Sequence, residues 1–461
     1  MSITAAFMVP HPPMIVPAVG QGSEERITTT VRAYEEVAKR IAAIRPDTII
    51  ISSPHSVMYA DYFHISPGNR AFGSFSEFRA PQVRMDLKYD EEFTAYVSKL
   101  CSEKAFPAGT LGERKRDLDH GTMVPLWFIL KEYTDFRLVR TGLSGLDLFK
   151  HYEYGMILKK AADDLGRRAV FVASGDLSHK LQTYGPYGFA EEGPVYDERI
   201  MDVCGNARFG ELFDFDEKFC EKAAECGHRS FVIMAGALDG EAVKSEKLSH
   251  EDVTGVGYGI CTFDVTGQDE DRHFLDKKLR ETDKELEEKK KTEDAYVRLA
   301  RASAEYFVKN GKEMQVPSDV PEELLQTRAG AFVSIHKFGR LRGCIGTILP
   351  VRDNLAEEIV RNAVSAVSED PRFDAVRPDE LRWLEINVDV LTKPERISSK
   401  DELDVKRYGV IVQQGMKRGL LLPDLDGVDT VEDQIDIARR KGNIAADADV
   451  ELFRFEVVRH R

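Results

Sequence analysis

Four side chains that can bind a metal ion or transfer a proton lie just after short apolar runs in the first half of the chain. They are His11, His55, Asp176 and His179. Imidazole and carboxylate groups bind divalent transition metals, and imidazole also exchanges protons near neutral pH. One histidine after a strand is usually an ordinary surface residue, but this pattern recurs in separate segments. His120, in the segment DLDHGTMVPL, joins them as a further candidate.

The apolar runs that precede these residues are typical of buried β-strands. They are Ala5 to Val9, Thr48 to Ser52 and Arg168 to Ser174, with a further strand expected at Phe136 to Thr141. Between them, Arg26 to Ile44 and Tyr152 to Leu165 carry apolar residues at helical spacing. Strands that alternate with helices build a layered α/β domain. Ligands of such sheets bind outside the carboxyl ends of the strands, so we expect the candidate side chains to meet there.

Glu225 and Cys226 are the candidates for an anionic third metal ligand. They precede Gly227 and the apolar run Ser230 to Leu238, which predicts a helix whose positive end favours a carboxylate or a thiolate. Two neutral imidazoles rarely hold a divalent ion without such a partner. The ordinary alternative is a buried, inert cysteine beside a solvated glutamate, and the sequence does not decide which residue faces the ion.

Length and composition exclude several classes of protein. A chain of 461 residues exceeds the size of one ordinary core, so we expect two domains. With 42% hydrophobic and 31% charged residues, the chain should fold rather than stay disordered. A formal charge of -15 argues against binding to nucleic acid or to anionic membranes, and it favours small molecules and proteins as partners.

The sequence also indicates a cellular compartment. No run of about 18 apolar residues predicts a membrane helix, and Met1 to Gly20 lacks the basic start and apolar core of a secretory signal. The six cysteines include no C-x-x-C pair, which favours reduced thiols over a disulfide framework. We therefore expect a cytoplasmic protein that has no membrane segment.

The segment Asp269 to Asp294 separates the two expected domains. It contains 11 acidic and 8 basic residues among 26, and Leu275, Leu279 and Leu286 form a thin apolar stripe. This composition predicts a solvated helix. We therefore expect an α/β domain at residues 1–268, a charged helical connector at 269–294 and a smaller domain at 295–461.

The smaller domain reads as α+β. Ala295 to Lys309 presents one apolar helical face, and it is followed by strand-like runs at Gly330 to His336, Leu384 to Leu391 and Gly409 to Val412.

Cys344 is the candidate reactive residue of the smaller domain. It lies in GRLRGCIGTILP with Arg340 and Arg342 nearby, and a thiol beside fixed positive charge can have a lowered pKa. The alternative is a small residue packed where two backbones approach closely. The later segment SEDPRF, Ser368 to Phe373, predicts a proline turn with an exposed pair of acidic residues.

Five short motifs of the first domain resemble the class III extradiol dioxygenase superfamily, and most closely its MEMO-like branch. They are HPP at 11–13, SPHS at 53–56, DHGT at 119–122, SGDLSH at 174–179 and ECGHR at 225–229. The resemblance implies a non-haem Fe(II) site in which His11 and His55 bind the metal. It also implies that His120 and His179 lie close by and transfer protons.

The third ligand departs from the usual carboxylate of that superfamily. As in the MEMO-like proteins, its position falls on Cys226, with Glu225 one residue away. A thiolate makes the site softer, so Zn(II), Cu(I) or a redox role are alternatives to Fe(II) and oxygen activation. Asp176 either orients His179 or caps the turn that follows it.

Four motifs of the second domain closely resemble the AMMECR domain. They are LRGCIGT, SEDPRF, LEINVDVL and GLLLP, and the match runs from about Ala295 to Val458. The resemblance implies a domain of unassigned activity with a cleft lined by the LRGCIG segment. The order of the two domains resembles bacterial proteins that accompany a radical-SAM enzyme, which implies such a partner.

These observations predict a metal-dependent oxidoreductase that acts on an unidentified small molecule, with His120, His179 and Asp176 as catalytic residues. The main alternative is a metal-binding or redox adaptor that recognises partner proteins without catalysis. A domain that keeps the fold and has lost its metal is a third reading. Because proteins of this superfamily often associate, we also expect a homo-oligomer.

Overall fold

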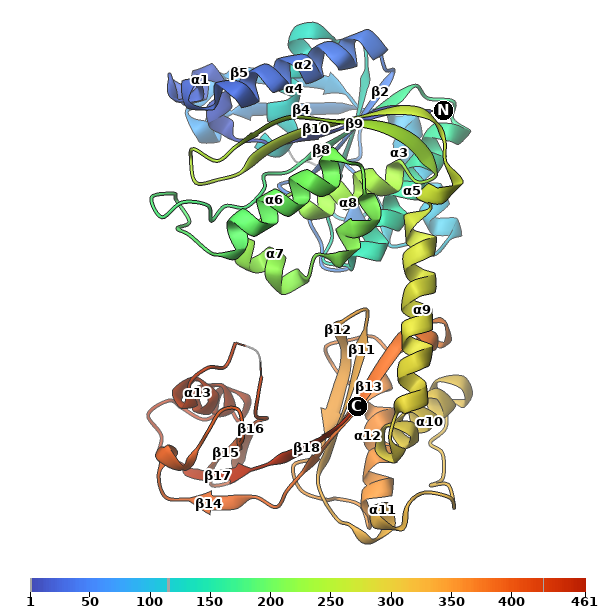
Figure 1. The fold of residues 1–461 in the computed structure, drawn as a ribbon, viewed down its shortest axis with the longest axis vertical. Helices are drawn as coiled ribbons and strands as arrows, with labels where there is room; N and C mark the ends of the chain where they lie inside the picture. Colours follow the sequence, from blue (N-terminus) through green and yellow to red (C-terminus); the bar gives the residue numbers. More distant parts are fainter. Residues whose placement is uncertain (1, 114–116, 426) are drawn as a thin grey trace. The chain divides into compact units, whose positions relative to one another are not determined.

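The computed structural model describes residues 2–113, 117–425 and 427–461. The chain divides into two compact units between Leu279 and Arg280. This boundary falls within the helix α9 (Phe274–Thr292), which forms from the charged segment between the expected domains (Figure 1). Among the described residues, no helix has the length and apolar character needed to cross a bilayer.

The first unit is built on one mixed β-sheet with the strand order β7-β2-β8-β1-β10-β9. The strands are β1 (Ile3–Val9), β2 (Thr48–Ser53), β7 (Arg137–Gly142), β8 (Ala169–Ser174), β9 (Glu241–Glu251) and β10 (Tyr258–Gln268). The four strands from β7 to β1 run parallel, and β10 and β9 complete the sheet as antiparallel strands. Two short ladders lie outside this sheet: β3 (Phe63–His64) with β6 (Ala108–Gly109), and β4 (Arg70–Phe75) with β5 (Ala80–Lys88).

Helices cover both faces of this sheet, as Figure 1 shows. One face packs against α3 (Glu91–Glu103), α5 (Leu148–Asp164), α6 (Glu192–Gly205) and α8 (His228–Ala237). The other face packs against α2 (Thr28–Ile44) and α4 (His120–Glu132). The short helices α1 (Pro17–Gly20) and α7 (Glu217–Ala223) complete the unit.

Continuous apolar runs make strands β2 and β8 buried along their whole length. A parallel strand covered on both faces needs apolar residues at successive positions, because neighbouring side chains point to opposite layers. In β1, Ala6 and Met8 join the cluster on the α5 side, whereas Phe7 and Val9 join the cluster on the α2 side. The predicted layered α/β architecture is confirmed.

The second unit is an α+β domain with two sheets. The first sheet has the order β12-β11-β13-β18 and consists of β11 (Ala331–Lys337), β12 (Arg340–Gly346), β13 (Leu384–Leu391) and β18 (Val457–His460). The second has the order β14-β17-β15-β16 and consists of β14 (Glu395–Ile397), β15 (Gly409–Gln414), β16 (Lys417–Leu421) and β17 (Glu451–Phe455). The helices are α10 (Ala295–Asn310), α11 (Glu322–Gln326), α12 (Leu355–Ser368) and α13 (Val431–Lys441).

The apolar faces of α10 and α12 form the main core of this unit together with one face of the first sheet. A smaller cluster lies between α13 and the second sheet.

Two loops of the first unit meet at a pair of glycines. A Cβ atom added to Gly175, which follows β8, would lie 2.1 Å from Cα of Gly227, which precedes α8. Backbone atoms cannot withdraw as a flexible side chain can. The absence of a side chain at Gly175 therefore lets the loop after β8 and the start of α8 touch.

We predict that Gly175→Ala lowers the free energy of unfolding by about 1–3 kcal/mol, because the added methyl group forces the two backbones apart. Urea unfolding followed by circular dichroism measures this change. Gly267→Ala is the matched control, since a Cβ atom at that position meets no atom within 4 Å. Equal stability of the two variants would contradict the close approach.

Candidate metal centre

The strand order brings the predicted residues to one edge of the sheet. Strands β2, β8 and β1 are neighbours and parallel, so their carboxyl ends lie together. His55 follows β2, His11 follows β1, and Asp176 and His179 follow the central strand β8. The site therefore lies where open α/β sheets commonly bind their ligands.

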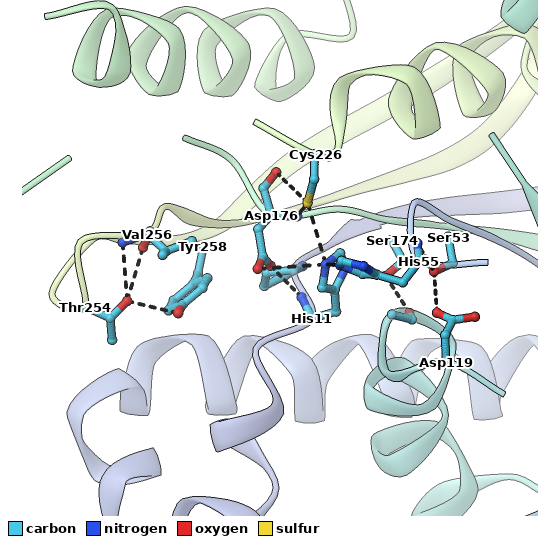
Figure 2. Close-up of polar contacts among 12 residues, drawn as sticks. His11, Ser53, His55, Asp119, Ser174, Asp176, Cys226, Thr254, Val256 and Tyr258 are labelled. Atoms are coloured by element: carbon cyan, nitrogen blue, oxygen red, sulfur yellow. Dashed lines mark hydrogen bonds and ion pairs between the residues drawn. The ribbon is translucent and has the colours of Figure 1, made fainter. Parts of the chain in front are cut away.

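Three ligand atoms converge at this edge (Figure 2). Nε2 of His11 lies 3.0 Å from Nε2 of His55 and 3.6 Å from Sγ of Cys226. The ligand atoms of these three residues all lie within 4.8 Å of one another. Asp176 and His179 form a second group of the same kind that shares Cys226.

The separation between His11 and Cys226 fits a bound transition metal. Metal–ligand distances of about 2.0–2.1 Å for nitrogen and about 2.3 Å for sulfur place tetrahedral nitrogen and sulfur donors about 3.6 Å apart. The distance between His11 Nε2 and Cys226 Sγ matches this value. The donor set therefore suits a metal ion whose remaining coordination positions stay open.

Ser174 fixes the form of His11 that can bind a metal. The Ser174 hydroxyl donates a hydrogen bond to the carbonyl of Gly121 at 2.6 Å, so its oxygen accepts from Nδ1 of His11 at 2.9 Å. A hydroxyl carries one proton and can donate only once. His11 is thus protonated on Nδ1, and Nε2 keeps its lone pair toward the other ligands. Burial lowers the pKa of His11, and His55 lowers it further, so the ring is neutral.

Cys226 is the side chain that reaches the two histidines. Its sulfur accepts a hydrogen bond from the backbone N–H of Asp176 at 3.3 Å. Burial raises the pKa of Cys226, and the nearby Asp176 and Glu225 raise it further. A bound cation would oppose this effect, because coordination favours the thiolate.

Glu225 points to the start of α8. Its carboxylate accepts a hydrogen bond from the backbone N–H of His228 at 2.6 Å, which satisfies a free amide of the helix. Burial raises the pKa of Glu225 to about 7. Glu225 belongs to neither ligand group of the described residues. The geometry thus favours Cys226 over Glu225, and the identity of the third ligand stays a prediction.

His120 and His179 lie close to the candidate centre but are not among the three residues that form it, which are His11, His55 and Cys226. The His120 ring lies 4.0 Å from the His55 ring, centroid to centroid, and burial together with His55 and His11 lowers the pKa of His120 to about 3. His179 stacks on Tyr187, and burial lowers its pKa. The buried Nε2 of His179 has no hydrogen-bond partner among the described residues. Burial thus favours the neutral form of both imidazoles, and the unpartnered Nε2 of His179 is the atom placed to accept a proton.

Asp176 occupies the centre of the edge. Its Oδ1 accepts a hydrogen bond from the backbone N–H of His11 at 2.7 Å, and its Oδ2 lies 3.8 Å from Nε2 of His11. Burial raises the pKa of Asp176, while His179 opposes this rise. The carboxylate thus contacts the backbone of one predicted ligand and lies near His179.

A buried polar network of Asp119, Ser53 and Arg140 supports the part of the site that holds His11 and His55. Asp119 caps α4 through the backbone N–H of Thr122 and accepts a hydrogen bond from Ser53 at 2.5 Å. Arg140 is 1% exposed and lies 3.8 Å from the Asp119 carboxylate, which lowers the pKa of Asp119. The sequence pattern assigned no role to Arg140, which is one of two arginines in the strand-like run FRLVRT. Tyr187 was also missed, and nothing in its local pattern indicated it.

The second unit corrects two expectations. Burial raises the pKa of Cys344, so the reading in which Arg340 and Arg342 lower that pKa is wrong, and the alternative of a small packed residue stays open. Arg342 is engaged by the buried Glu380 at 3.0 Å. The arginine that lowers the pKa of Cys344 is Arg372, and burial outweighs this effect. The expected exposed acid pair is also wrong in part, because Asp370 is 4% exposed.

An α/β sheet with two imidazoles and a thiol close together at its carboxyl edge is a candidate metal-binding fold. The family described as the catalytic LigB subunit of aromatic ring-opening dioxygenase matches residues 5–261, and the AMMECR1 family matches residues 297–460. The chain therefore belongs to the LigB family, in its MEMO-like form, and carries a C-terminal AMMECR1 domain. The resemblance of both domains is confirmed.

The chain is similar to several other proteins. A Clostridium acetobutylicum protein is 42% identical over 469 residues, which cover 100% of both chains. A Thermotoga maritima protein is 52% identical over 171 residues, or 37% of this chain and 98% of its own. The solved structure of an uncharacterized Pyrococcus horikoshii protein covers 36% of this chain and 88% of its own, with 32% identity and a TM-score of 0.34.

We predict that Ser174→Ala weakens metal binding about 10–100-fold, because the variant loses the group that fixes the tautomer of His11. Competitive titration with a chromophoric chelator measures the affinity. Ser98→Ala is the control: its hydroxyl donates to the carbonyl of Thr94 within α3 and touches no predicted ligand. Unchanged affinity in the Ser174 variant would rule out this role.

Proposed function

We propose that the first domain is a metal-dependent oxidoreductase of the extradiol dioxygenase superfamily that acts on an unidentified small molecule. The observation that carries this proposal is the convergence of His11 Nε2, His55 Nε2 and Cys226 Sγ at the carboxyl edge of the sheet. Family membership supports the same chemistry, since such dioxygenases typically use non-haem Fe(II). When bound, the metal supplies a Lewis-acidic and redox-active centre for substrate and dioxygen.

The neighbouring side chains supply the proton chemistry of the proposal. His179 offers a buried Nε2 with no partner among the described residues, so it can accept the proton of a bound hydroxyl group. The His120 ring lies 4.0 Å from the His55 ring, centroid to centroid, so it is close enough to the site to take part in a second transfer. Asp176 holds the His11 backbone and favours the protonated form of His179.

Fe(II) is the metal that we propose, with Zn(II) and Cu(I) as the alternatives. A mixed set of imidazole and thiolate suits all three, because thiolate is softer than the carboxylate of the usual iron triad. We also propose a radical-SAM protein as partner and a homo-oligomer as the assembly. The joined MEMO-like and AMMECR1 domains support the first of these, and the association common in the superfamily supports the second.

The test begins with protein purified without oxygen or chelator and loaded with Fe(II). Metal content and oxygen consumption with a panel of catechols and other phenols are then measured. We expect one tightly bound iron per chain and consumption of oxygen with at least one phenol. Stoichiometric iron with no turnover on any compound would favour a metal-binding or redox adaptor that does not catalyse a reaction.

We predict that His179→Gln retains the metal and lowers turnover about 10²–10⁴-fold, because the variant loses the proton acceptor and no predicted iron ligand. His11→Ala should instead lose the metal itself. Metal analysis of both variants beside their rates of oxygen consumption separates the two roles. Loss of metal in the His179 variant, or full activity in the His11 variant, would contradict the assignment.

A second candidate is a metal-binding or redox adaptor without turnover. The thiol at the third-ligand position favours it, since thiolates bind Cu(I) and Zn(II) well and can be oxidised reversibly. Reversible loss of the metal on mild oxidation, with no substrate consumed, is the result that this candidate predicts.

A further inference from the structure

The two histidines of the candidate centre are held in different ways. The His11 ring is fixed by the hydrogen bond from its Nδ1 to Ser174. Nε2 of His55 faces Nε2 of His11, and no group of the described residues bonds to Nδ1 of His55. The position of the His55 ring therefore depends on the turn that carries it and on the surfaces that enclose it.

The turn that carries His55, residues 53–56, is bonded on both sides of the histidine. Ser53 Oγ accepts a hydrogen bond from the backbone N–H of His55 at 3.2 Å and donates one to Oδ1 of Asp119 at 2.5 Å (Figure 2). Ser56 Oγ accepts a hydrogen bond from Nε of Arg140 at 3.2 Å. The turn is closed by the backbone N–H of Ser56, which donates to the Ser53 carbonyl at 3.3 Å. Both flanks of His55 are thus tied to charged side chains.

Arg140 joins these contacts from within the core. It is 1% exposed and lies on β7, the neighbour of the strand β2 that leads into the turn. Its Nη1 donates to the carbonyl of Asp117 at 3.1 Å, and its Nε lies 3.8 Å from Oδ2 of Asp119. A guanidinium carries its donors in one rigid plane and can hold several acceptors at once. Arg140 therefore links the turn of His55 to the segment that leads into α4.

Stability alone does not account for a charge at this position. Apolar residues of similar volume often replace a buried ion pair without loss of stability, because the removal of two charges from water is costly. What an apolar side chain cannot do is donate to Ser56 and to the Asp117 carbonyl. The contribution of Arg140 therefore lies in the groups that it holds in place.

The surfaces around the His55 ring leave little room for movement. A Cβ atom on Gly121, in the first turn of α4, would lie 3.4 Å from Cδ2 of His55 and would collide with the Ser53 hydroxyl. The ring of His120 lies 4.0 Å from the His55 ring, centroid to centroid, and Asp119 caps the same helix. A displacement of the turn relative to α4 would therefore move His55 out of line with the other predicted ligands.

We propose that Arg140 is a positioning residue for His55. It holds Ser56 directly and the Asp119–Ser53 pair through its charge, so that Nε2 of His55 faces Nε2 of His11 and Sγ of Cys226. The inference rests on the metal centre of the proposed function, but it concerns metal binding and does not depend on turnover.

The test measures the Zn(II) affinity of the full-length protein by competition with a chromophoric chelator. Arg140→Met keeps much of the side-chain volume and removes the donors, and it should weaken Zn(II) binding about 10–100-fold. Arg167→Met is the matched control. Arg167 pairs with the buried Asp90, which caps α3 and accepts a hydrogen bond from Thr48 at the start of β2, away from the carboxyl edge. This control should leave the Zn(II) affinity unchanged.

A double-mutant cycle separates positioning from a general loosening of the fold. In the His55→Ala background, Arg140→Met should change the Zn(II) affinity by less than about threefold, because the residue that it positions is already gone. In the Ser174→Ala background, which affects His11, the losses from the two changes should multiply. A general loosening would lower the affinity equally in both backgrounds.

Ser56→Ala carries the test if Arg140→Met does not fold. This variant removes only the hydroxyl that Nε of Arg140 contacts, and it should weaken Zn(II) binding about fivefold, as expected for the loss of one hydrogen bond. Ser98→Ala is again its control.

Two results would overturn the inference alone. One is a full effect of His55→Ala beside unchanged affinity in Arg140→Met or, if that variant does not fold, in Ser56→Ala. The other is an equal loss from Arg140→Met in the His55→Ala and Ser174→Ala backgrounds. Unchanged affinity in His55→Ala itself would overturn the metal centre, and the inference with it.

Discussion

The adjacency of β2, β8 and β1 is the constraint on which the candidate centre depends. Each strand ends in a different loop, and the parallel register places the three loops at one edge of the sheet. Segments more than 160 residues apart in the sequence then share hydrogen bonds, as between His11 and Ser174. Because these strands are buried on both faces, the position of the edge is fixed by the core of the whole domain.

The Ser174 hydroxyl sets which nitrogen of His11 carries the proton. Ser174 is the last residue of β8. Its hydroxyl donates a hydrogen bond to the carbonyl of Gly121 in α4 and accepts one from Nδ1 of His11, which follows β1. One hydroxyl thus links three elements and selects the tautomer of the imidazole. On the other side of the site, the buried pair of Arg140 and Asp119 connects β7 to the start of α4. The centre is therefore positioned by polar contacts within a core that is otherwise apolar.

Much of this arrangement could be predicted from the sequence, and the failures have physical causes. The strands before His11, His55 and Asp176 were predictable because parallel strands covered on both faces consist mostly of consecutive apolar residues. The choice between Glu225 and Cys226 could not be predicted, because both residues precede α8 in the sequence. Only the structure shows that Glu225 bonds to the free backbone amide of His228. Two arginines lie near Cys344 in the sequence, but Arg342 bonds to Glu380, and the arginine that contacts Cys344 is Arg372, from a separate turn. Such pairings depend on tertiary structure and leave no local pattern.

The most direct measurement of the central claim is X-ray absorption spectroscopy of the protein loaded with Zn(II). The account predicts one sulfur scatterer at about 2.3 Å and at least two imidazole nitrogens at about 2.0–2.1 Å. In Cys226→Ser, the sulfur scatterer should vanish while the imidazole pattern remains. A spectrum with only oxygen and nitrogen ligands in the unaltered protein would contradict the account, because it would place the metal away from the thiol.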